Sequence, residues 1–274
     1  MKKNEIKKGK KIASKEQRQL MLDMLKYIDK ICRDNKIRYS LIGGSLIGAI
    51  RHHGYIPWDD DIDIGLMRDD YYKLKRILDG ETGIYQTLKF GSGGERFPFL
   101  KFVDTRTIAR EPFQSFSNYG VFVDIFCYYP VADNPKIRLK NFKKIDFLRH
   151  LFSRKKLDFG KRSFKSNVVQ LYRNTISRLI GYKRLHKIYN GILDDSKWIG
   201  SDYIVVDWPI AGYAKEIQLK KNTEEYIDTR FENLTVMIFK NYDEILRTTF
   251  DDYMQLPPKS KRTPKHNLEM WWKA

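Results

Sequence analysis

Residues 43–66 read GGSLIGAIRHHGYIPWDDDIDIGL, and the end of this stretch alternates carboxylates with isoleucines. In an extended strand, side chains two positions apart share a face. We therefore expect Asp59, Asp61 and Asp63 on one face, and the isoleucines, with Asp60, on the other. Carboxylates held side by side repel one another unless a cation compensates them, and such oxygen ligands suit Mg²⁺ or Mn²⁺ bound with phosphates. The stretch predicts a strand that carries a divalent-metal site for a phosphate ester.

Two other interpretations of the aspartates are weaker. A run of acidic residues is usually solvated surface, but a surface loop has no reason to interleave Ile62 and Ile64 with the carboxylates. A calcium loop that starts at Asp59 requires glycine at its sixth position, where Ile64 stands, and glutamate at its twelfth, where Asp70 stands. The flanking pattern therefore favours the metal site.

The glycines before the aspartates form the second half of the expected site. Residues 38–42 are a short strand candidate that ends at Gly43, Gly44 and Ser45, and residues 46–51 are expected to be helical. Glycine lets the backbone approach a ligand closely, and the free amides at a helix start favour anions. Gly44 and the Ser45 hydroxyl are therefore candidate phosphate-binding groups, although a Gly-Gly-Ser sequence is also common in ordinary strand-to-helix turns.

Basic side chains near this turn are further candidates. Arg51 follows the helical stretch, and its guanidinium suits phosphate oxygens and the charge that develops in phosphoryl transfer. His52 is a weaker candidate for substrate binding, because a loop histidine is more often structural or solvated. Lys101 is another candidate for binding the substrate phosphate.

Asp124 lies in the apolar sequence 120–126, GVFVDIF. A carboxylate in so apolar a strand is costly unless a metal, a hydrogen-bond donor or a basic partner compensates it. If this strand lies beside Asp61 and Asp63, Asp124 either completes the metal shell or takes a proton from the acceptor. A buried aspartate that caps a turn is the alternative.

The stretch 43–66 resembles the signature of the LicD family, which also includes fukutin and fukutin-related protein. The similarity continues in residues 120–126, which match the family's second acidic strand, and in residues 101–105 (KFVDT), which match the segment before it. Residues 252–258 (DYMQLPP), with the basic pair at 261–262, are similar to its C-terminal signature. Residues 136–224 lie outside this resemblance.

The resemblance implies a nucleotidyltransferase fold of the polymerase-β type. It also implies transfer of a phosphorylated alcohol, such as phosphocholine, glycerol phosphate or ribitol phosphate, from a CDP-activated donor to a hydroxyl of a glycan or its lipid-linked precursor, with release of CMP. For Asp124 it favours the role of general base, because the corresponding family carboxylate faces the incoming hydroxyl. Two alternatives stay open: a nucleotidyltransferase acting on RNA or a small molecule, and an inactive module that binds polyanions.

The net charge of +18 is unevenly distributed. Residues 1–40 carry +8 and residues 136–190 carry +15, whereas residues 41–135 carry −3 and residues 191–274 carry −2. Apolar residues in 136–190 recur at helical spacing between the lysines and arginines. Such a basic amphipathic region predicts contact with an anionic membrane surface, with nucleic acid as the less favoured partner.

Composition and length add further limits. No apolar stretch approaches the roughly eighteen residues of a membrane span, and the N-terminus runs into charged sequence without a signal peptide. We therefore expect a cytoplasmic protein, with possible peripheral contact at the inner face of the membrane. Cys32 and Cys127 are expected to be reduced core residues.

The coarse architecture is α+β, with a mixed sheet packed by helices on one side. The expected strands are 38–42, 61–66, 99–103, 121–126 and 235–239, and the expected helices are 14–35, 69–78 and 242–253. Ser14 and Gln17 predict a capping box at the first helix. We divide the chain into an N-terminal helix with a nucleotidyltransferase-like core (1–135), a basic, mostly helical insertion (136–224) and a C-terminal part that packs on the core (225–274).

Overall fold

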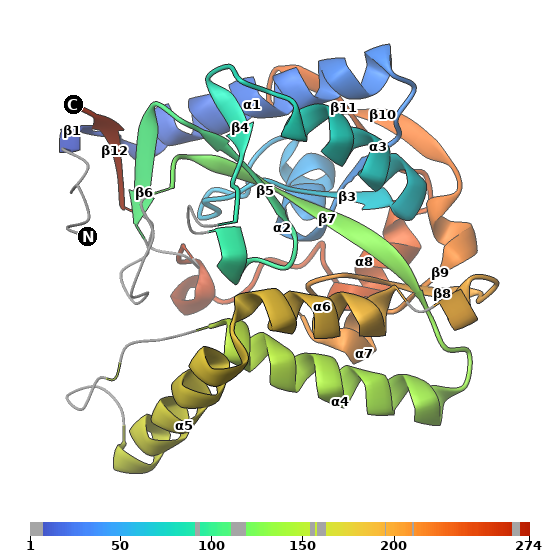
Figure 1. The fold of residues 1–274 in the computed structure, drawn as a ribbon. Coiled ribbons are helices and arrows are strands. Elements are labelled where there is room, and N and C mark those ends of the chain that lie inside the picture. Colours follow the sequence, from blue (N-terminus) through green and yellow to red (C-terminus); the bar gives the residue numbers. More distant parts are fainter. Residues whose placement is uncertain are drawn as a thin grey trace.

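The computed structural model describes residues 8–90, 94–110, 119–153, 157, 163–194, 196–209, 211–264 and 269–274. Within them, a mixed sheet of seven strands forms the centre of the molecule (Figure 1). The strand order is β2-β3-β7-β5-β4, and β8 extends the sheet beside β7 and carries β9 at its other edge. The strands are β2 (Ser40–Leu41), β3 (Asp63–Met67), β4 (Tyr85–Thr87), β5 (Leu100–Asp104), β7 (Phe122–Val131), β8 (Tyr203–Val206) and β9 (Gln218–Leu219).

The two strands predicted from the acidic motifs lie side by side at the centre of this sheet. β3 and β7 pair in parallel, whereas the other neighbouring strands pair antiparallel. Ile64 and Leu66 of β3 point into the main core, as the alternation predicted, because a strand side chain faces the opposite side from its neighbour. The expected mixed α+β arrangement is therefore confirmed.

One face of the sheet is covered by α1 (Ser14–Asp34) and α3 (Arg68–Asp79), as Figure 1 shows. The apolar stripe of α1 is buried because residues three and four apart share one face of a helix. The predicted capping box is wrong: Ala13 is the N-cap, and no side chain caps the helix there. The Glu16 carboxylate instead accepts a hydrogen bond from Trp272 Nε1 at 3.0 Å.

Helices also cover the second face, so the expectation of helices on one side only is wrong. There, Phe126 and Tyr128 of β7 pack with Ile245 of α8 (Tyr242–Phe250) in a smaller apolar cluster. The helices α4 (Pro135–Phe152), α6 (Tyr182–Leu193) and α7 (Tyr213–Glu216) lie on the same side of the sheet in Figure 1. The apolar stripe of α8 was visible in the sequence, but the face on which it packs depends on long-range contacts.

The basic region is helical, as predicted, and forms α4, α5 (Phe164–Ile180) and α6. After this region, the short 3₁₀ turn Ser196–Trp198 precedes β8. Because β8 and β9 belong to the central sheet, the later part of the segment 136–224 is continuous with the core. The domain boundaries at residues 135 and 224 stay predictions.

The C-terminal part packs against the core in two places. β10 (Tyr226–Phe231) and β11 (Leu234–Phe239) form a hairpin, and β11 lies against β2. β12 (Glu269–Lys273) pairs with β1 (Lys8–Lys11) and β6 (Thr107–Arg110), so the last strand joins the first in a separate antiparallel sheet.

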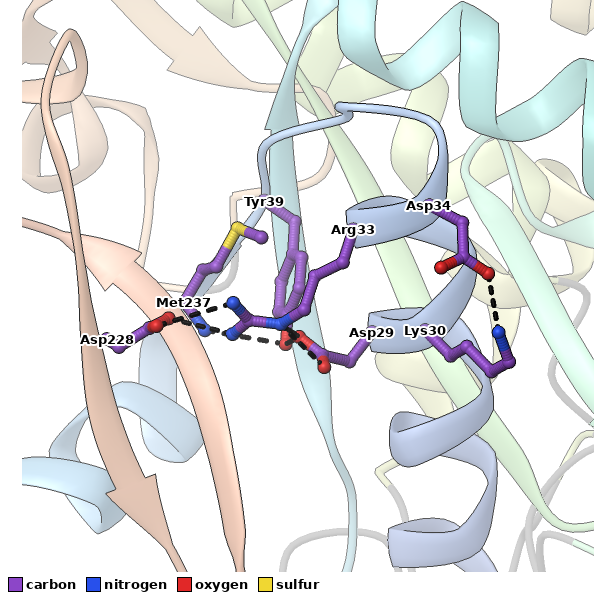
Figure 2. Close-up of polar contacts among 7 residues, drawn as sticks. All are labelled: Asp29, Lys30, Arg33, Asp34, Tyr39, Asp228 and Met237. Carbon is purple, nitrogen blue, oxygen red and sulfur yellow. Dashed lines mark hydrogen bonds and ion pairs between the residues drawn. The ribbon is translucent and has the colours of Figure 1, made fainter.

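Arg33 of α1 ties the first helix to the hairpin, as Figure 2 shows. Its Nη2 lies 2.7 Å from Asp228 Oδ1 of β10, and its Nε lies 2.9 Å from Asp29 Oδ2. The buried Tyr39 hydroxyl donates to Asp29 Oδ1 at 2.9 Å and accepts from the Met237 amide of β11 at 3.4 Å. These contacts fix the helix and the hairpin around β2.

The structure also bears on the two cysteines and on the question of a membrane-spanning helix. Cys32 and Cys127 are both buried free thiols, as predicted. No helix in the described part of the chain combines the length and the apolar character that crossing a membrane requires.

Candidate active site

A cavity of about 450 Å³ lies between the second face of the sheet and the helices that cover it. One end is lined by glycines and carboxylates, and the other by aromatic and aliphatic side chains. The acidic end consists of Gly43, Gly44, Asp59, Asp61, Asp63 and Asp124, and the apolar end includes Phe99, Phe126, Tyr128, Val206, Trp208 and Phe250.

Strand register places the buried acidic residues side by side. Asp63 opens β3 and is the register partner of Asp124 in the parallel neighbour β7. Neighbouring strands lie about 4.8 Å apart, so the two side chains project from adjacent positions on the same face. Asp124 is also the register partner of Lys101 in β5, on its other side. Three charged residues therefore lie in a row across three adjacent strands.

The loop before β3 brings further carboxylates to the same end. Asp59, Asp60 and Asp61 each offer an oxygen within 4.8 Å of the others, a spacing that could hold a metal ion. Asp59, Asp61 and Asp63 line the cavity, whereas Asp60 is not among its lining residues. Strand alternation applies only from Asp63 onward, because residues 59–62 precede the strand.

The N-terminal end of α1 holds this acidic loop in place. Arg18 Nη2 donates to the Pro57 carbonyl at 2.6 Å and to the Asp59 carbonyl at 3.0 Å. Gln17 Nε2 donates to the Asp60 carbonyl at 2.9 Å. These contacts act on the loop backbone and leave the carboxylates to other partners. Sequence reasoning missed both residues, since they lie about forty positions before the loop.

The electrostatics of the acidic end fit a divalent cation. Burial, followed by the charges of Asp61, Asp124 and Asp59, raises the pKa of Asp63 well above its ordinary value, and Lys101 opposes this shift. Burial penalises the ionised form, and neighbouring negative charges penalise it further. A cation at this position relieves both costs, so these oxygen ligands fit Mg²⁺ or Mn²⁺.

The glycine turn is shaped by the same carboxylates. Gly43 has a φ of +55°, which favours glycine, and a side chain on Gly44 would collide with the Asp59 carboxylate. The Ser45 hydroxyl is buried and accepts a hydrogen bond from the Asp63 amide at 3.0 Å. Gly44 therefore borders the cavity as expected, whereas Ser45 positions the start of β3 and is absent from the cavity lining.

Arg51 and His52 do not line the cavity. They lie in a π-helical turn (Gly48–His52), where Arg51 donates to the carbonyls of Tyr253 and Gln255 and to His52 Nε2. Burial, with the nearby Arg262 charge, lowers the pKa of Arg51, and burial next to Arg51 lowers the pKa of His52. Arg51 thus holds the C-terminal segment against the core, and His52 accepts a hydrogen bond from Arg51 and packs edge-on against the Trp58 ring.

Lys101, predicted to bind phosphate, is paired with a carboxylate. Its Nζ lies 2.5 Å from Asp124 Oδ1, and its side chain is 3% exposed. The ammonium also lies 3.1 Å from the centroid of the Phe122 ring and 4.7 Å from that of Phe97, where ring faces attract a cation. Lys101 thus compensates and orients Asp124, and it is absent from the cavity lining.

Among the described residues, Arg149 of α4 is the basic residue that lines the cavity, and sequence reasoning missed it. Its guanidinium lies 4.7 Å from the centroid of the Trp208 ring, and its Nε is buried without a hydrogen-bond partner in the described residues. Asp146 is a distant partner at 3.9 Å. A signal was present: Arg149 falls seven positions after Phe142, on the apolar stripe of its helix, where a charge is unexpected.

The apolar end forms an aromatic wall with one carboxylate beside it. The rings of Phe99 and Phe126 lie 4.6 Å apart, and those of Phe99 and Trp208 lie 5.8 Å apart. Glu216 of α7 borders the same cavity. Together, the two ends can hold a metal with phosphate oxygens and, next to them, an organic group that is apolar or cationic.

Comparisons with known proteins show what the chain is similar to. Residues 36–166 match a family described as LicD/FKTN/FKRP, nucleotidyltransferase domain, and this range contains the cavity's aspartates and Arg149. The chain is 31% identical to the lipopolysaccharide cholinephosphotransferase LicD of Haemophilus influenzae, over 96% of this chain and 99% of that protein. A part of 58 residues is 38% identical to the ribitol 5-phosphate transferase FKRP of Homo sapiens, covering 21% of this chain and 12% of that one.

Proposed function

The chain belongs to the LicD family, and from this premise we propose that it transfers a phosphorylated alcohol from a CDP-activated donor to a hydroxyl of a glycan or its lipid-linked precursor, releasing CMP. The observation that carries the proposal is the pairing of Asp63 with Asp124 at the acidic end of a cavity whose other end is aromatic. Such a cavity accommodates a metal-bound diphosphate and the organic group attached to it.

We assign the metal to Asp61 and Asp63, with Asp59 close enough to contribute. Mg²⁺ or Mn²⁺ held there would neutralise negative charge on the donor diphosphate. The backbone amides of Gly43 and Gly44 are the first of their helix, and such amides lack partners within the helix and suit phosphate oxygens. The core would accordingly be of the nucleotidyltransferase type.

The remaining side chains have separate roles in the transfer. The acceptor oxygen forms a bond to the phosphorus that carries the alcohol, and the bond from this phosphorus to the CMP oxygen breaks. Asp124, held by Lys101, would accept the proton of the acceptor hydroxyl. Arg149 would contact phosphate oxygens through its guanidinium, the role that the sequence suggested for Arg51.

Among the alcohols, choline suits the aromatic end best. A quaternary ammonium is attracted to the faces of aromatic rings, and with Arg149 on Trp208, the rings of Phe99, Phe126 and Tyr128 stay as its partners. Asp124, Phe126 and Tyr128 alternate along one face of β7, so the aromatic residues begin one pleat repeat, about 7 Å, beyond the catalytic carboxylate. Glu216 adds a negative charge on the same wall. The name of the Haemophilus relative agrees with this choice.

The test is a comparison of donors. The protein is incubated with Mg²⁺, a glycolipid extract from the cells that make it, and CDP-choline, CDP-glycerol or CDP-ribitol, and CMP release is measured. CDP-choline should give the fastest release, and Phe126→Leu should reduce this advantage. Incorporation of label from CTP into RNA, with no CMP from any of the three donors, would instead support a nucleotidyltransferase.

A further inference from the structure

The helix α5 turns its apolar side outward. Figure 1 shows α5 extending from the body beside α4 and α6, and it contacts both of these helices. Its buried residues are polar: Asn167, Gln170 and Ser177. One side of the helix carries exposed large apolar side chains, namely Phe164 (76%), Val168 (47%), Leu171 (53%), Tyr172 (63%) and Leu179 (78%), whereas Ile176 and Ile180 on another side pack against the main core. Most of the apolar surface of α5 therefore faces outward, unlike that of a helix whose whole apolar stripe packs into a core.

The buried amide side chains of α5 make hydrogen bonds. Gln170 Nε2 donates to the Ser153 carbonyl at 3.4 Å and to Asn174 Oδ1 at 2.9 Å, and Asn167 Nδ2 donates to the Ser163 carbonyl at 3.3 Å. The helix therefore packs on the protein through the Gln170 contact and through Ile176 and Ile180. Its exposed apolar face runs over several turns at the spacing of one helix face, and an apolar surface this continuous marks an interaction site.

The charged residues of α5 and of its neighbour α6 are all basic. α5 and α6 contain no acidic residue, and exposed lysines and arginines accompany the apolar stripe, including Lys165, Arg178, Lys183, Arg184 and Lys187. Two copies of such a face would bring like charges together. Anionic lipid headgroups compensate the charges, and the acyl region takes up the apolar side chains. Nucleic acid would compensate the charges but leave the apolar side chains exposed to water.

We propose that α5 is a membrane-docking helix, which lies on an anionic lipid surface with its apolar face inserted and its basic residues at the headgroups. The surface is separate from the catalytic cavity, because none of these residues lines it. The inference goes beyond the phosphotransferase activity: it states where the enzyme works, at the surface where a lipid-linked acceptor would lie. The basic residues Lys155, Lys156, Lys161 and Arg162, in the same region of the sequence, lie outside the described residues.

Vesicle sedimentation tests the proposal with matched variants. The full chain should bind vesicles of phosphatidylglycerol and phosphatidylcholine but not vesicles of phosphatidylcholine alone, and binding should weaken as salt rises from 0.1 M to 0.5 M. The double variant Leu171→Gln with Leu179→Gln should lose at least about tenfold in affinity. Neutralising Arg178 and Lys183 to glutamine should cost roughly fivefold per charge. Ile199→Gln, which removes an equally exposed apolar side chain outside α5, should bind like the wild type.

Controls keep the outcomes distinct. The α5 variants should keep the wild-type unfolding temperature, since the altered side chains are exposed, and should release CMP from CDP-choline at the wild-type rate in detergent solution. Equal vesicle binding by wild type and the Leu171→Gln, Leu179→Gln variant would overturn the proposal. A wild-type dimer in analytical ultracentrifugation that the same variant converts to a monomer would overturn it in favour of a second copy. RNA binding without vesicle binding would overturn it in favour of nucleic acid.

Discussion

Lys101 Nζ lies 2.5 Å from Asp124 Oδ1, and both residues are buried on neighbouring strands at the acidic end of the cavity. A buried ion pair is costly to break, because removal of one partner leaves the other charge uncompensated in a poorly solvated place. This pair supplies the basic partner that an aspartate in so apolar a strand requires. It also holds Asp124 beside Asp63, where the proposed transfer takes place.

Lys101→Met should therefore lower the free energy of unfolding by roughly 3 kcal/mol, because the Asp124 charge loses its partner. Adding Asp124→Asn in the same chain should restore most of this loss, since no charge is then left unpaired. Urea unfolding of the two single variants and the double variant measures the coupling. Additive losses in the double variant would show that the two side chains stabilise the fold independently.

If the site binds a divalent metal ion, the ion should raise the free energy of unfolding. Mn²⁺ at a hundred times its dissociation constant should stabilise the wild type by about 2.7 kcal/mol. Asp61→Asn and Asp63→Asn should each abolish this gain, and without metal they should be as stable as the wild type or more so, because a repulsive neighbour is gone. Thermal unfolding with and without Mn²⁺ gives both quantities. An unchanged Mn²⁺ effect in Asp63→Asn would remove that residue from the metal site.

Arg149 should matter for donor binding, and Arg138 serves as its control. Both lie on α4 and rest on aromatic rings, Arg149 on Trp208 and Arg138 on Tyr203, but only Arg149 lines the cavity. A hydrogen bond to a charged group contributes about 1.5–3 kcal/mol, so Arg149→Gln should raise the KM for the CDP donor about ten- to a hundredfold. Arg138→Gln should leave this KM unchanged. Equal effects of the two changes would indicate a structural role for both arginines.

Asp207 predicts a pH dependence of stability. Burial raises its pKa well above the ordinary value, and its Oδ1 accepts no hydrogen bond from the described residues. A carboxyl that binds its proton more tightly when folded makes the protein less stable as pH rises above about 4, by up to about 1.4 kcal/mol per pH unit, until the folded group ionises. Asp207→Asn removes this contribution and should be the more stable protein at neutral pH.

The measurement is urea unfolding in the presence of a chelator between pH 4 and 8. The difference between wild type and Asp207→Asn isolates the contribution of this carboxyl, because the other titrating groups are shared. Asp252→Asn changes the charge equally at an exposed position and should give no such difference. A wild type that gains stability relative to Asp207→Asn as pH rises would contradict the assignment.

Local pattern was enough to predict the elements of the site. The alternation around Asp63 and the apolar run around Asp124 each indicate a strand from a few neighbouring residues, and the structure has strands there. The pairing of β3 with β7 was a conditional expectation, because register is decided by contacts between distant segments. The partner of Lys101 was missed for the same reason. A lysine can pair with a phosphate or with a carboxylate, and only the register of β5 with β7 shows that the partner is Asp124.

Closeness in the sequence pointed to the wrong arginine as the residue that lines the cavity. Arg51 is close to the glycine turn in the chain, but the π-helical turn directs it to the carbonyls of Tyr253 and Gln255. Arg149 lines the cavity from α4, which lies on the second side of the sheet (Figure 1), and the signal in the sequence was a charge on an apolar stripe. The exposure of the apolar face of α5 could not be predicted either, because periodicity identifies an apolar face without saying whether a core covers it.

The most direct test of the account is CMP release from CDP-choline by the purified chain in the presence of its glycolipid acceptor. We expect release with Mg²⁺ or Mn²⁺, no release after chelation, and a loss of at least about a hundredfold in Asp63→Asn, since the metal contribution is worth several kcal/mol. The variant should still fold, and without metal its unfolding temperature should equal or exceed that of the wild type. Release that continues after chelation, or near-normal release by a folded Asp63→Asn at saturating metal, would contradict the proposed site.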